Sequence, residues 1–96
     1  MLKNLTVRPY MIALSGITVL SLPRDAKILG VMCSNTNDVL LHVLINLDVK
    51  HFEEREFYSA PSCVTFTEKV ELLKYIGSVY MHSGSGGFHV FEVLKY

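Results

Sequence analysis

The chain has 96 residues, of which 50% are apolar, and its nine basic side chains are matched by nine acidic ones. This length predicts a single domain over residues 1–96, with one core that needs neither a metal nor disulfides. The neutral balance, without two adjacent basic residues, argues against non-specific binding to nucleic acid or to an anionic membrane, because both need a concentrated positive field.

Short β-branched and aromatic runs separated by turn residues predict an all-β, mainly antiparallel domain, either a small sandwich or a barrel-like sheet. The expected strands, about six to seven in number, cover residues 5–10, 17–22, 26–33, 39–47, 51–58, 75–82 and 88–95. We expect the first two to pair with each other around Ser15 and Gly16. The turn at residues 34–38 contains Asn and Asp, which tolerate left-handed backbone angles.

The middle of the chain carries the clearest alternation of charge. Residues 51–58 place Arg55 and Phe57 on one face and Glu54 and Glu56 on the other. The charged centre predicts an exposed face or an edge strand protected against pairing with other chains. Residues 65 and 68 have the spacing of a capping box, so a short helix near residues 66–74 is the competing interpretation there.

The glycine-rich stretch at residues 83–87 predicts a hairpin turn. A phosphate-binding loop should open a helix, whereas β-forming residues follow Gly87. A five-residue loop would put His82 and His89 on opposite faces of the sheet, and a six-residue loop or a bulge would pair them directly. Even a paired couple lacks a clear third ligand, unless His42 supplies it, so we expect no metal site and no cofactor.

The sequence gives little support for a catalytic group. Ser83 or Ser85 could act with a histidine, but neither has a strained elbow or an orienting acid beside it in the sequence. Glu54 and Glu56 share a strand face, which a solvated strand balanced by Arg55 explains more simply. We therefore expect a non-enzymatic protein.

The last strands predict a subunit contact as well as core packing. Phe88 and Val90 fall on one face of the final strand, whereas Phe91 and Val93 fall on the other. Strands that are apolar on both sides are usually covered on both sides, so we expect a homodimer. The residues expected at this dimer or core seam are Tyr80, Phe88, Phe91 and Val93. Gly77 would leave room for a cross-strand aromatic ring.

The two cysteines predict free thiols in a cytoplasmic protein. Cys33 and Cys63 are too few for a disulfide framework and lack zinc or redox spacing. The alternative is export with one Cys33–Cys63 bridge, because residues 3–22 superficially resemble a signal peptide. That segment has no small-residue cleavage site and is too short to span a bilayer.

Two spaced motifs resemble a family of small uncharacterised proteins of bacteria and their phages. The motifs are Leu22-Pro23 with Ala26-Lys27-Ile28-Leu29 and Val31, and Tyr75-Ile76-Gly77-Ser78-Val79 with Phe88-His89-Val90-Phe91-Glu92. The chain departs from the family at Leu41-His42-Val43, where members often carry tryptophan, and at residues 55–61, where they tend to show a GTGHP stretch. The resemblance implies a small cytoplasmic β-protein in a phage or prophage setting, with no established activity.

These observations together favour a phage-type accessory protein that binds a host protein or assembly, as in host takeover or counter-defence. The candidate binding residues are His82, His89, Glu53, Glu54, Arg55 and Glu56. The alternative is a sponge-like protein that binds a small molecule or nucleotide at a dimer seam near His82 and His89. A hydrolase that uses histidine or glutamate is a third hypothesis, and it would need a concave site.

Overall fold

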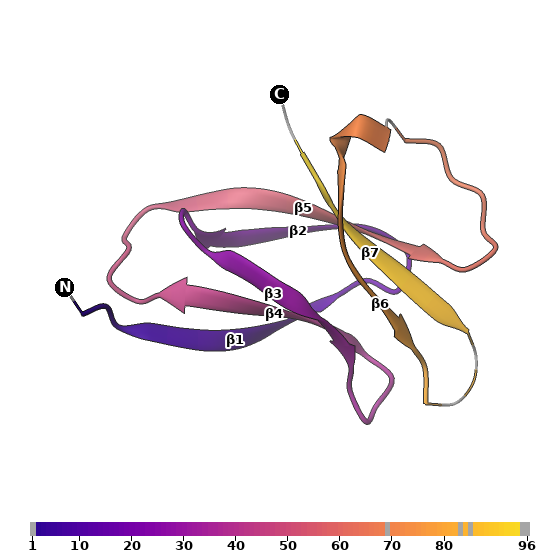
Figure 1. Cartoon of the computed structure of the whole chain (residues 1–96), viewed down its shortest axis with the longest axis horizontal. Coiled ribbons are helices and arrows are strands. Elements are labelled where there is room, and N and C mark those ends of the chain that lie inside the picture. Colours follow the sequence, from indigo (N-terminus) through magenta and orange to yellow (C-terminus); the bar gives the residue numbers. More distant parts are fainter. Residues whose placement is uncertain (1, 69, 83, 85, 95–96) are drawn as a thin grey trace.

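The computed structural model describes residues 2–68, 70–82, 84 and 86–94, with only the backbone of Val70. In this part of the chain, seven antiparallel strands form two sheets that pack into a sandwich (Figure 1). The strands are β1 (Leu5–Ile12), β2 (Gly16–Pro23), β3 (Lys27–Cys33), β4 (Val39–Asn46), β5 (Phe52–Pro61), β6 (Leu73–Tyr80) and β7 (Gly87–Val93). One sheet has the order β1-β4-β3 and the other β2-β5-β7-β6. The predicted all-β fold is confirmed.

The first two strands form as predicted, but the prediction that they pair with each other is wrong. β1 pairs with β4 along its whole length, and β2 pairs with β5 in the other sheet. The chain crosses between the sheets at residues 13–15, where the Ala13 amide donates to Thr18 Oγ1 at 2.8 Å. Gly16 has a φ of 89°, which only glycine adopts readily. This crossing lets Ile12 and Leu22 enter the same core from opposite sheets.

The charged strand β5 is central, so the edge-strand alternative is wrong, whereas the exposed-face alternative agrees with the outward position of Glu54. It lies between β2 and β7. Its inner row contains Arg55 and Phe57, and its outer row contains Glu54 and Glu56. The central position is tolerated because the inner cation has a buried partner, described below, while the glutamates face outward.

The core lies between the two sheets and follows the period-2 pattern. On β4, alternate residues from Val39 to Ile45 are buried, and the residues between them face outward. The core residues are Ile12, Leu22, Ala26, Val39, Leu41, Val43, Ile45, Phe57, Val79, Met81 and Val90. At the β3–β4 turn, Asn37 has a φ of 62°, in agreement with the expected left-handed angle.

The β6–β7 hairpin is confirmed, but neither predicted register is found. The last pair is Tyr80 with Gly87, and His89 lies opposite Ser78. His82 belongs to the connection, where its backbone amide donates to Asn37 Oδ1 at 3.1 Å. Residues 83 and 85 of this connection, the two candidate serines, lie outside the described residues.

The helix expected near residues 66–74 is reduced to a single 3-10 turn at Val70–Leu72. Residues 64–68 are irregular instead, with Phe66 lying on Tyr58. Gly77 has the predicted close neighbour, but it is Val31 of the opposite sheet rather than an aromatic ring. No helix among the described residues is long and apolar enough to cross a membrane.

Candidate functional site

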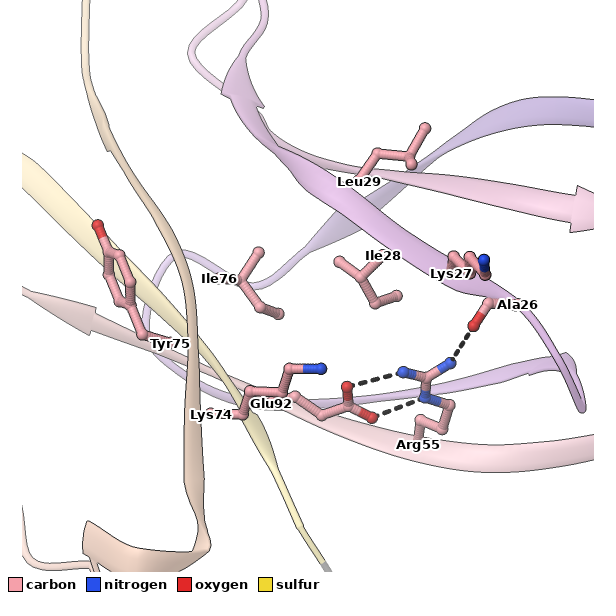
Figure 2. Close-up of a pocket in the computed structure, with 9 residues that line it drawn as sticks. All are labelled: Ala26, Lys27, Ile28, Leu29, Arg55, Lys74, Tyr75, Ile76 and Glu92. Carbon is pink, nitrogen blue, oxygen red and sulfur yellow. Dashed lines mark hydrogen bonds and ion pairs between the residues drawn. The ribbon is translucent and has the colours of Figure 1, made fainter.

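A cleft of about 380 Å³ opens between the edge strands β3 and β6, which belong to different sheets (Figure 2). The two strands approach closely at Gly77, where an added Cβ would lie 2.9 Å from Val31 Cγ1. The residues that line the cleft are Ala26, Lys27, Ile28, Leu29, Arg55, Lys74, Tyr75, Ile76 and Glu92. A site of this size falls in the range of small-molecule pockets.

Both strands of the cleft carry a β-bulge at the same place. The pairing of β3 shifts between Ile28 and Gly30, and the pairing of β6 shifts between Tyr75 and Gly77. A bulge inserts one unpaired residue, bends its strand and re-aims side chains, and bulges often adjoin binding sites. In Figure 2, Ile28 and Ile76 face each other across the cleft. The two bulges therefore shape the cleft and supply its apolar surface.

An ion pair forms the polar end of the cleft. Arg55 Nε lies 2.6 Å from Glu92 Oε2, and Arg55 Nη2 lies 2.7 Å from Glu92 Oε1. Arg55 Nη1 also donates to the Ala26 carbonyl at 2.8 Å, which ties the four-stranded sheet to the segment before β3. The side chains are only 18% and 9% exposed. This two-pronged geometry is the strong form of an Arg–carboxylate pair.

The carboxylate stabilises the protonated form of the guanidinium. The hydrogen bonds that Arg55 donates to Glu92 raise the pKa of Arg55, burial opposes this rise, and the negative charges of Glu92 and Glu53 add to it. Arg55 therefore keeps its positive charge at ordinary pH. Its role is to hold Glu92 and the two sheets in place.

A neighbouring hollow of about 490 Å³ adjoins the cleft and shares Arg55, Lys74 and Glu92 with it. Glu53, Glu54 and Glu56 lie around this hollow. The acidic segment is thus placed beside the cleft, and its central Arg55 belongs to the cleft itself.

The outer face of the four-stranded sheet carries an aromatic cluster, which consists of Tyr58, Phe66, Tyr75 and Phe91. The ring centroids of Tyr58 and Phe66 are 5.0 Å apart in a stacked arrangement. Tyr75 meets Phe91 edge-on at 5.7 Å. Phe66 comes from the irregular segment after β5, so the cluster joins that segment to the sheet.

His89 is held by two serine hydroxyls on the same outer face. Its Nδ1 lies 2.8 Å from Ser78 Oγ, and its Nε2 lies 2.8 Å from Ser62 Oγ. Ser78 Oγ in turn contacts Tyr75 Oη at 2.6 Å. A serine on an imidazole is half of a nucleophile–base pair, but a hydroxyl rather than a carboxylate holds the other ring nitrogen. The network orients His89 and fastens Ser62 to the sheet.

The other residues predicted for binding, or for the dimer or core seam, do not lie together in the structure. His82 lies in the hairpin connection, and neither it nor His89 lines the cleft or the neighbouring hollow. Phe88 packs against the core, whereas Tyr80, Phe91 and Val93 lie on the outer row. The predicted seam is therefore divided between the two sides of the sheet.

Glu92 and Lys74 were missed from the sequence. Glu92 shares its strand face with Phe88 and Val90. An acidic residue in an otherwise core-facing row signals a buried partner, because an unpaired buried charge is costly. Arg55 was the cation that could have been proposed as this partner, because it lies on the same inner row of β5 as the core residue Phe57.

The outer face of the three-stranded sheet is apolar. Leu5, Val7, Met11, Leu29 and Met32 are each about half exposed there. His42 lies in the middle strand of this face, and its Nε2 is buried without a hydrogen-bond partner among the described residues.

Metal ligands do not gather in the described part of the chain, where no three His, Cys, Asp or Glu side chains form a group that could hold an ion. Cys33 and Cys63 are both free thiols, so the alternative Cys33–Cys63 bridge is not formed. Cys33 Sγ lies 3.6 Å from Met81 Sδ, at the border of the core.

No curated protein and no solved structure matches this chain. The model of a domain of unknown function, DUF7352, matches residues 4–95. Because this match spans nearly the whole length, the protein belongs to the uncharacterised DUF7352 family.

Proposed function

We propose that the protein is a non-enzymatic binding protein that docks another protein on the outer face of its four-stranded sheet. The observation that carries this proposal is a continuous apolar row across all four strands. Ile17 pairs with Tyr58, Tyr58 with Phe91, and Phe91 with Tyr75. In the phage setting that the sequence resemblance implies, the partner is a host protein.

The composition of this face supports a protein partner. Ile17 and Tyr75 at the two ends of the row are 48% and 59% exposed. The next row contains the exposed Val19 beside Glu56. Tyrosine and phenylalanine are enriched where protein interfaces bury their anchors, and charged side chains form the rim. The exposed carboxylate of Glu54 therefore favours a partner with a basic rim around an apolar centre.

The experiment compares capture of partners by the tagged protein and by face variants. We expect one host protein to be retained by the wild-type chain and lost by Ile17→Lys and by Tyr75→Lys. Val7→Lys, on the outer face of the other sheet, is the matched control and should retain the partner. Circular dichroism establishes that each variant is folded. Absence of any partner above background, or equal retention by Ile17→Lys, would count against the proposal.

We also propose that a second copy of the chain covers the outer face of the three-stranded sheet. The outward rows of this face contain a single charged residue, Lys27, at one corner, so two copies meet without opposed like charges at the centre. From the spacing of residues and strands its footprint is roughly 400 Å², the size of apolar patch that marks an interaction site. A symmetric dimer uses the same patch on both copies.

The oligomeric state tests this second proposal. Sedimentation velocity should show a dimer that dissociates on dilution, because the footprint is smaller than that of a standard interface. Met11→Glu and Met32→Glu should each give monomers at all concentrations, whereas Ile17→Lys should still dimerise. A wild-type chain that stays monomeric at high concentration would contradict the proposal.

A further inference from the structure

We propose that the cleft between β3 and β6 binds a small organic anion. Its carboxylate or phosphate head lies by Lys27 and Lys74, and its short apolar body lies on Ile28 and Ile76. The cleft borders both outer sheet faces, since Lys27, Leu29 and Tyr75 also belong to its lining. The inference does not rest on the protein-binding function, because its principal contacts, Lys74, Ile28 and Ile76, are not part of the proposed docking row. Its volume of about 380 Å³ is within the range of sites that enclose small ligands.

The charge of the cleft favours an anion. Its lining contains three cationic groups, Lys27, Arg55 and Lys74, against the single carboxylate of Glu92. Glu92 is already engaged by two hydrogen bonds from Arg55. Neither lysine has a hydrogen-bond or ion-pair partner among the described residues. In the described part of the chain, a lysine without a direct partner therefore lies on each wall, Lys27 on β3 and Lys74 on β6.

The position of Lys74 makes it the principal contact for the head group. Its cross-strand neighbour on β7 is Glu92, so it belongs to the inner row of the sheet and faces the space between the sheets. Lys27 comes from the opposite strand, at the rim. The guanidinium of Arg55 donates its hydrogen bonds to Glu92 and to the Ala26 carbonyl, so it fixes the position of the polar end of the cleft.

The two bulges supply an apolar surface that a simple ion site would not need. Ile76 is the extra residue of the β6 bulge, and it faces Ile28 across the cleft (Figure 2). Both isoleucines also pack against the core, so their positions are fixed before a ligand arrives. An apolar wall with a few placed charges is the general form of a site for small organic molecules.

The neighbouring carboxylates limit the size of the anion. Glu53, Glu54 and Glu56 lie around the adjoining hollow, where they would repel a polyanion such as a nucleic acid that extended past the cleft. A molecule with one anionic head and a short chain avoids them. The carboxylates thus restrict the site to small anions.

The test is a titration of the full-length protein, observed by two-dimensional NMR, with octanoate, hexyl phosphate and inorganic phosphate. We expect saturable binding of octanoate or hexyl phosphate, with shifts of the Ile28 and Ile76 methyl groups, and much weaker binding of inorganic phosphate. The tighter of the two amphipathic probes identifies the head group as carboxylate or phosphate.

Matched lysine variants locate the head group. Lys74→Gln should weaken binding roughly two- to fivefold, as expected for one partly exposed ion pair, and Lys27→Gln should weaken it less. Lys50→Gln, at an exposed position of the β4–β5 connection, is the control and should bind like the wild type. The proposal is overturned if neither amphipathic probe binds, if inorganic phosphate binds as tightly as hexyl phosphate, or if Lys50→Gln weakens binding as much as Lys74→Gln does.

Discussion

Replacement of Arg55 by methionine should be among the most damaging single changes in this small domain. The variant removes two bonds to Glu92, of 2.6 and 2.7 Å, and the bond to the Ala26 carbonyl. It leaves a carboxylate that is only 9% exposed without its cation. Breaking a buried pair on one side costs about 3–5 kcal/mol, and we expect the lower end, about 3 kcal/mol, because Arg55 itself is 18% exposed.

That loss is large compared with the whole stability of such a domain, which is about 5–15 kcal/mol. For a chain of this length it corresponds to a fall in Tm of roughly 12–24 °C. The chain has no tryptophan, so urea unfolding should be followed by far-ultraviolet circular dichroism. The double variant Arg55→Met/Glu92→Leu is the control, and it should recover most of the stability because no buried charge is left unpaired.

The pH of the measurement follows from the sign of the shift. The pKa of Arg55 is raised by Glu92, so the linked stabilisation is fully present below the unfolded-state pKa. It is lost only as the pH rises through the still higher folded-state pKa. At pH 7 the whole effect is therefore measured. A loss below about 1 kcal/mol, the value of an exposed pair, would refute the reasoning, as would a double variant no more stable than Arg55→Met.

Three further changes test other parts of the structure. Gly77→Ala should lower the free energy of unfolding in urea by about 1–3 kcal/mol, because the added Cβ would lie 2.9 Å from Val31 Cγ1. Gly30→Ala is the control, since its Cβ would meet nothing within 4 Å. An equal loss in the control would argue against the contact. His42→Leu should raise the free energy of unfolding by about 1–3 kcal/mol, since it removes a buried nitrogen without a partner; an unchanged value in dilute solution would mean that the nitrogen is solvated. Phe66→Ala should speed amide exchange in residues 62–68, because the stacking of Phe66 on Tyr58 holds that segment against the sheet. The free energy of unfolding should fall by less than about 1.5 kcal/mol. Unchanged exchange would show that the His89–Ser62 contact alone holds the segment.

The sequence alone determined the approximate positions of the strands and, on β5, which residues share a face. On β5, for example, the alternation of Arg55 and Phe57 with Glu54 and Glu56 is visible in the sequence and is the arrangement of rows found. The β6–β7 hairpin and the left-handed Asn37 were likewise predictable. These features depend on near neighbours in the chain, through the two-residue period of a strand and the backbone freedom of turn residues.

Only the tertiary structure decided which strands are partners and which charges meet. Strand order depends on how both sheets bury their apolar sides at once, so β1 and β2 separate and the charged β5 becomes central. The bulges at Ile28/Gly30 and Tyr75/Gly77 change the register locally and open the cleft. Arg55 and Glu92 are 37 residues apart, and their pairing exists only because β5 and β7 are neighbours. A local pattern shows that a charge points inward, but only the folded chain shows what meets it.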